Sequence, residues 1–202
     1  MKRSAPSRRL PRIDAAVIGA SAGGVDALVA LFNGLPAHWR LPLVVVIHLP
    51  GNHDSRLAEV FRPRVPLAVR EAEDKAPVAA ATLYFAPPGY HLSIEHDRSF
   101  SLSCEPPVHF SRPSIDVLMA SAADAYGPAL AGLLLTGANE DGAEGLLCIH
   151  RAGGLTAVQD PAEAQVPTMP LAAIKAHQPD FVQPLRELRN LLLQLDSAHG
   201  RP

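Results

Sequence analysis

Cysteine is scarce in this sequence: its 202 residues contain only Cys104 and Cys148, which lie far apart and outside any C-x-x-C motif. Two such cysteines exclude the disulfide framework of a small secreted domain and the ligand set of a zinc ribbon. Both have apolar neighbours and are expected in the core. Because free thiols persist in a reducing compartment, the expected location is the cytoplasm.

The sequence also lacks an excess of either positive or negative charge. Lys and Arg together number 18, Asp and Glu number 20, and the formal net charge is −2. This balance gives no general attraction to nucleic acid or to a membrane surface, so neither is expected as a partner. No apolar run has the length of a membrane span, so membrane insertion is not expected. Residues 1–12, MKRSAPSRRLPR, are expected to form a basic tail rather than a secretory signal.

The rest of the chain alternates short apolar, β-branched runs with segments of helical spacing. Unbroken apolar runs are typical of strands covered on both faces. The pattern predicts an α/β fold with a doubly wound, mainly parallel sheet flanked by helices. The expected strands are 14–20, 41–49, 66–72, 128–137 and 155–160, and the expected helices are 25–35, 55–61, 114–126 and 141–153.

Residues 81–105 differ, because apolar and polar residues alternate there around the turn-forming Pro-Gly and His-Asp-Arg segments. We interpret this stretch as an inserted β-hairpin. The chain contains no internal repeat and no clear linker, and its length suits one domain. We place that domain at 13–195, between the N-terminal tail and a C-terminal tail at 196–202.

The segment Gly19-Ala20-Ser21-Ala22-Gly23-Gly24 joins the first expected strand to a helix, and two kinds of site fit it. A dinucleotide site would have glycine in place of Ser21 and an acidic residue at the end of the next strand, which instead ends in His48. No Gly-Lys-Ser/Thr follows, as a P-loop requires. A nucleotide-binding domain is therefore the weaker alternative. A metal site is also weak, because no H-E-x-x-H motif includes His48 or His53.

The other kind of site presents a nucleophile. The turn matches G-x-S-x-G, a strand–turn–helix elbow in which Ser21 would be exposed above the sheet. The following helix N-terminus offers N–H groups to an oxyanion. His48, at the next strand end, could act as the base. Asp141, after a third strand, could orient the imidazole, but Glu140 competes for that role and residue spacing leaves the choice open.

Ordered blocks along nearly the whole chain, from about Ile13 to Leu195, resemble those of the CheB-type chemotaxis methylesterases. Their number and order make this resemblance far more specific than G-x-S-x-G alone. The blocks are VIGASAGG, HLPGNHDSRLAEVF, VREAED, LYFAPPGYHL, RPSIDVLMASAADAYG, LLLTGANEDGAEGL, and RAGG followed by QD.

The resemblance implies a serine hydrolase that removes methyl groups from glutamate γ-methyl esters of chemoreceptors; some members also deamidate receptor glutamines. It implies Ser21, His48 and Asp141 as the catalytic triad, which settles the choice between the two neighbouring acids. The backbone N–H groups of Ala22 and Ala138 are implied as the oxyanion site. The implied partner is the methylated cytoplasmic domain of a chemoreceptor, and no cofactor or metal is implied.

Some positions depart from the family pattern, all outside the triad. The N-terminal receiver domain of typical members is also unmatched, since only about a dozen residues precede the catalytic domain. Activity is therefore expected without phosphorylation, with any control from a separate regulatory protein or from expression. A non-catalytic binding module with this fold is the alternative to an enzyme. The departures are Ala22 for Thr, His53 for Phe, Ala138-Asn139 for Met-Gly, and Thr168-Met169-Pro170-Leu171 for Gly-Met-Pro-Arg.

Overall fold

The structure is a computed structural model that describes residues 10–49 and 56–199. The expectations for His53, for most of the tail 1–12 and for residues 200–202 lie outside the described residues.

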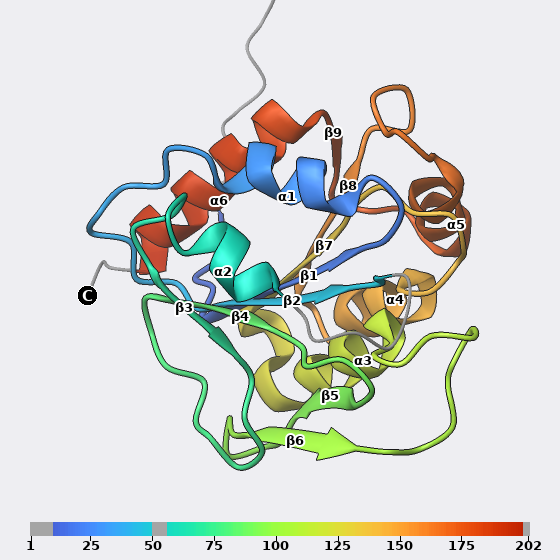
Figure 1. Cartoon of the computed structure of the whole chain (residues 1–202). Coiled ribbons are helices and arrows are strands. Elements are labelled where there is room, and N and C mark those ends of the chain that lie inside the picture. The colour runs from blue at the N-terminus through green and yellow to red at the C-terminus, as the bar shows by residue number, and fades with distance from the viewer. Residues whose placement is uncertain (1–9, 50–55, 200–202) are drawn as a thin grey trace, which may run out of the picture.

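A seven-stranded parallel sheet forms the centre of the molecule (Figure 1). The strand order is β3-β4-β2-β1-β7-β8-β9. The central strands β1, β2 and β7 are buried along their whole length, as their unbroken apolar sequences predict. The strands are β1 Ala15–Ala20, β2 Leu43–Ile47, β3 Ala68–Glu71, β4 Thr82–Phe85, β7 Leu130–Leu134, β8 Leu155–Gln159 and β9 Phe181–Gln183.

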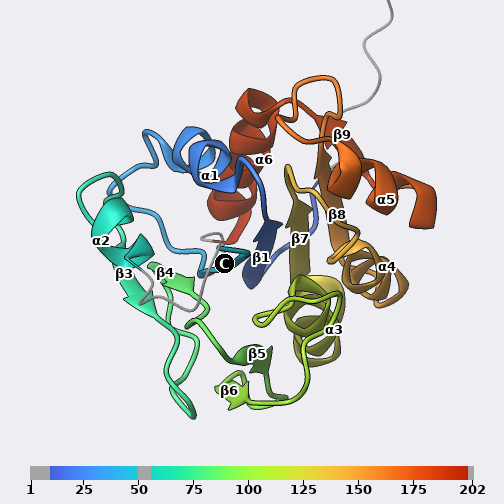
Figure 2. The same cartoon turned by 45° about the vertical axis from the view of Figure 1, so that its right-hand side comes forward.

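Helices cover both faces of this sheet (Figure 2), which confirms the predicted doubly wound α/β fold. One face carries α1 (Gly24–Phe32), α2 (Leu57–Phe61) and α6 (Leu185–His199) over one apolar core. The other face carries α3 (Ile115–Tyr126), α4 (Ala143–Arg151) and α5 (Thr168–Ala176) over a second core. A short 3-10 helix, η1 (Gly127–Ala129), links α3 to β7. None of the helices in the described ranges is long and apolar enough to span a bilayer.

The predicted hairpin is present but shorter than expected. It consists of β5 (His91–Ile94) and β6 (Phe100–Ser103), which form a separate antiparallel two-stranded sheet. The first part of the stretch, Thr82–Phe85, is β4 and belongs to the central sheet. All four β4 residues are buried, because strands flank them on both sides and side chains cover both faces.

The C-terminal part of the domain differs most from expectation. α5, β9 and α6 were not predicted, and α6 continues past residue 195 to His199. Asp196 in α6 is buried, and its Oδ1 accepts hydrogen bonds from the backbone N–H groups of Arg40 and Leu41. Cys104, expected in the core, is exposed because it follows the short hairpin strand β6.

The strand order places a topological switch point in the middle of the sheet. From β1 the chain first adds strands on the β2 side and later adds β7, β8 and β9 on the other side. Loops leaving β1 and β7 therefore diverge to opposite faces and open a crevice at the carboxyl ends of the strands. Ser21 follows β1, His48 follows β2, and Asp141 lies in the segment between β7 and α4.

We predict that Asp196→Ala lowers the free energy of unfolding by about 2 kcal/mol, because it leaves the buried N–H of Leu41 without an acceptor. Asp196→Asn keeps an Oδ1 acceptor and should cost less. Urea denaturation of both variants measures the difference. Equal losses in the two variants would contradict a role for Asp196 as acceptor.

Candidate active site

Ser21 lies in the tight turn between β1 and α1. Gly23, just before the helix, has φ of 78°, a left-handed conformation that favours glycine. The Ser21 N–H donates to the carbonyl oxygen of Thr136 at 2.9 Å. The Thr136 hydroxyl in turn donates to the carbonyl oxygen of Ala22 at 2.8 Å. Thr136, which follows β7, therefore fixes the serine turn from the neighbouring strand.

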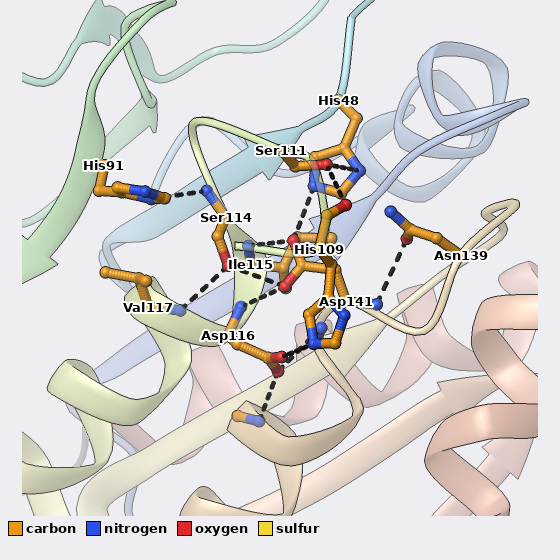
Figure 3. A network of polar contacts seen from close by, with 12 residues as sticks. His48, His91, His109, Ser111, Ser114, Ile115, Asp116, Val117, Asn139 and Asp141 are labelled. Carbon is orange, nitrogen blue, oxygen red and sulfur yellow. Dashed lines mark hydrogen bonds and ion pairs between the residues drawn. The ribbon is translucent and has the colours of Figure 1, made fainter. Parts of the chain in front are cut away.

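His48 follows β2 directly. Its backbone N–H donates to the Ala20 carbonyl oxygen at 3.1 Å, which continues the pairing of β1 with β2. Its Nε2 lies 2.8 Å from Asp141 Oδ2. Because an ionised carboxylate can only accept, Nε2 carries the hydrogen of the neutral ring and Nδ1 keeps the lone pair. Nδ1 lies 3.4 Å from Ser111 Oγ, a long contact (Figure 3).

Asp141 is fully buried and accepts four hydrogen bonds (Figure 3). Oδ2 accepts from His48 Nε2 and from the Ile115 N–H, both at 2.8 Å. Oδ1 accepts from the Ser114 hydroxyl at 2.8 Å and from the Asp116 N–H at 3.0 Å. Burial alone would raise the pKa of Asp141, but these hydrogen bonds, His48 first, outweigh it and hold the pKa below its usual value.

Glu140 has different surroundings. Its side chain is 71% exposed, and its Oε1 lies 3.8 Å from His109 Nδ1. Of the two acids that residue spacing left open, Asp141 is therefore the one in contact with His48.

A cavity of about 520 Å³ opens beside Ser21 and His48. Its wall is formed by the serine turn, the start of α1, the end of β2 and one residue of a later loop: Ser21, Ala22, Gly23, Gly24, Val25, Asp26, Ile47, His48, Leu49 and Gln165. No hydrogen bond joins the Ser21 and His48 side chains in the part of the chain that the structure describes. Such contacts often form only when substrate is bound.

The expected oxyanion groups lie in two different loops. Ala22 lines the cavity and Ala138 is exposed in the loop after β7, outside the lining residues. Neither backbone N–H donates to another residue within the described ranges. Both N–H groups are therefore available to an oxygen atom that enters from solvent.

Asp116 connects this site to α4, and sequence reasoning missed it. Its Oδ1 accepts the N–H groups of Gly142 at 2.9 Å and Gly145 at 2.7 Å, so it caps the N-terminus of α4 from another helix. Its Oδ2 lies 3.4 Å from His109 Nε2. Burial raises the pKa of Asp116 to about 6, and the nearby charge of Asp141 adds to the effect.

Other contributors were also missed, among them Thr136, Ser114, Ser111 and Gln165. Ser114 caps α3 and also donates to Asp141, and its N–H donates to Nδ1 of the buried His91. A serine before an apolar helix is a recognisable start signal, but that signal contains nothing about a carboxylate in a distant loop. Within the described ranges, no group of three or more His, Cys, Asp or Glu residues could hold a metal ion.

Similar proteins are known over nearly the whole chain. The family model described as CheB methylesterase matches residues 16–192. A Leptospira interrogans protein whose name assigns it as a putative protein-glutamate methylesterase/protein-glutamine glutaminase is 42% identical over 183 residues, which are 91% of this chain and 95% of that protein. A Hahella chejuensis protein with the same assigned activities is 42% identical over 85% of this chain, but over only 48% of its own length.

A solved structure is also similar. The crystal structure of the Thermotoga maritima CheB methylesterase catalytic domain superposes with a TM-score of 0.86 at 29% identity. The match covers 92% of this chain and all of that domain. The sheet, the flanking helices and the hairpin are therefore a known arrangement.

We predict that Asp116→Asn changes how stability depends on pH. The pKa of Asp116 is raised from 3.8 to about 6 on folding, so between these values the folded state binds more protons than the unfolded state. The free energy of unfolding of the wild type, relative to the variant, should fall as pH rises from 4 to 6. The largest expected slope is about 1.4 kcal/mol per pH unit.

Urea denaturation at several pH values measures this difference. The amide in Asp116→Asn retains one oxygen for the two N–H groups of α4, so the cap is preserved. Glu140→Gln, which removes an exposed carboxylate from the adjoining loop, is the control for loss of one negative charge. Parallel curves for the wild type and Asp116→Asn would contradict the prediction.

Proposed function

Since the chain belongs to the CheB methylesterase family, we propose that it hydrolyses glutamate γ-methyl esters on the cytoplasmic domain of a chemoreceptor, with Ser21 as nucleophile. One observation carries the proposal: the 2.8 Å contact of His48 with the buried Asp141, beside a cavity that Ser21 and His48 share. Three loops that are distant in sequence bring these groups together at the switch point, where ligands bind in open α/β sheets.

In the first step, Ser21 Oγ attacks the ester carbonyl carbon while His48 accepts its proton. Nε2 is occupied by Asp141, so the accepting atom is Nδ1. This assigns the two ring nitrogens in the opposite sense to the familiar serine-protease triad, where Nε2 faces the serine. Asp141 holds the ring in this tautomer and stabilises the imidazolium that forms. Its lowered pKa supports this role, because the carboxylate stays ionised at neutral pH.

The negative charge that develops on the carbonyl oxygen requires donors. The backbone N–H groups of Ala22 and Ala138 are assigned this function because they face no acceptor within the described residues. Since the donors belong to the backbone, replacing the family's usual Thr and Met side chains with alanine at these positions leaves the N–H groups in place.

Collapse of the intermediate expels methanol, which takes the proton from Nδ1 of His48. Water then attacks the acyl-enzyme with the same base, and the products are a glutamate carboxylate and free Ser21. A glutamine side chain would follow the same path with ammonia as the leaving group. This second reaction agrees with the glutaminase activity in the names of the relatives. Neither reaction involves a cofactor in this proposal.

The first test is Ser21→Ala. We predict that it lowers kcat for methanol release by several orders of magnitude, because the covalent intermediate cannot form. The variant should retain the circular dichroism spectrum and Tm of the wild type. An active-site serine probe should label the wild type only. A well-folded variant with near wild-type turnover would exclude the serine mechanism, and a wild type without turnover would favour a binding module.

A second test treats His48 and Asp141 as one unit. Asp141→Asn should lower kcat by about 10⁴-fold, because the amide no longer fixes the tautomer or stabilises the imidazolium. The double variant with His48→Ala should be hardly slower than His48→Ala alone. Methanol release measured for all three variants decides the point. Multiplicative losses would contradict a shared proton transfer.

A further inference from the structure

Phe110 is a large apolar side chain that packs against nothing, since its side chain is fully exposed. It lies in the segment between β6 and α3, at the tip of a tight turn. An exposed phenylalanine lacks the favourable free energy that an aromatic side chain gains when it is buried in a core or an interface.

The backbone of the turn adds a second observation. Val108 and Ser111 exchange two backbone hydrogen bonds, of 3.1 and 2.8 Å, so His109 and Phe110 form a two-residue hairpin turn. Their φ angles are 47° and 62°. Turns with both central residues in the left-handed region usually contain Asn-Gly, because other residues are strained there. Strain of this kind clusters at functional sites.

The turn is attached to the candidate active site through the residues on either side of Phe110. Ser111 Oγ lies 3.4 Å from His48 Nδ1. His109 Nε2 lies 3.4 Å from Asp116 Oδ2, beside the loop that contains Asp141 (Figure 3). Phe110 is therefore an exposed residue directly before Ser111, which contacts His48. Leu49, which follows His48 and lines the cavity, is also 40% exposed.

We propose that Phe110 is a substrate-docking residue, whose ring packs against an apolar side chain of the protein segment that carries the methyl ester. The proposal rests on the proposed function. When a glutamate side chain enters the cavity, the residues on either side of it must lie outside the cavity. Leu49 at the cavity wall and the turn that contacts His48 through Ser111 are the exposed surfaces closest to such a segment. A small ester has no such segment and makes no contact with the ring.

The test compares two substrates by steady-state kinetics. One is a chemoreceptor cytoplasmic fragment carrying radiolabelled methyl groups, and the other is the γ-methyl ester of N-acetylglutamate amide. Phe110→Ala should lower kcat/KM for the fragment about tenfold or more, mainly through KM, and leave kcat/KM for the small ester unchanged. Phe110→Leu, which keeps a large apolar side chain, should restore most of the loss.

Two further variants separate docking from folding. Phe110→Gly removes the ring and relieves the left-handed strain, so it should impair the fragment reaction without lowering Tm. Val182→Ala shortens another exposed apolar side chain, in β9, and should affect neither substrate.

Each outcome has one meaning. An equal loss of kcat/KM for both substrates in Phe110→Ala would show that Phe110 acts through His48. An unchanged kcat/KM for the fragment would show that the ring does not contact the substrate. Either result overturns the proposal. If the wild type hydrolyses the small ester but not the fragment, the reaction stands and the docking proposal fails. If it hydrolyses neither, the proposed function fails.

Discussion

The buried carboxylate of Asp141 is the group on which the arrangement of the site depends. An ionised carboxylate without partners is too costly to bury, so its four donors must all be held in place by the fold. Three of the donors come from the start of α3, two of them from its backbone, and the fourth is His48. The same interaction therefore anchors α3 against the loop before α4 and orients the imidazole beside the cavity.

Asp116 connects the Asp141 carboxylate to a second helix, α4. Its N–H donates to Asp141 while its own carboxylate accepts the N–H groups of Gly142 and Gly145, so Asp116 fixes the end of the loop that leads into α4. The two acids have pKa values shifted in opposite directions, because Asp141 has more strong donors and Asp116 is dominated by burial. One carboxylate is thereby kept ionised, and the other gains a proton more readily.

Backbone groups are prominent in the candidate site, and they do not depend on which side chain stands at a position. The serine turn is held by Thr136 through backbone atoms of Ser21 and Ala22. The proposed oxyanion donors are backbone N–H groups.

The sequence alone determined the fold class, most of the central strands and the short hairpin, because these depend on hydrophobic periodicity and turn residues that are local in the chain. It also placed Ser21 and His48 at strand ends. It did not determine α5, β9 or α6: β9 is a three-residue edge strand, and the start of α5 has no clear cap. Residue spacing left the choice between Glu140 and Asp141 open, and the family resemblance favoured Asp141. Only the tertiary structure shows which groups surround the Asp141 carboxylate and which ring nitrogen of His48 faces it. The carboxylate of Asp141 is held by donors at the start of α3, which lie 25 to 27 residues before it in the sequence. No local sequence pattern encodes a contact over that separation.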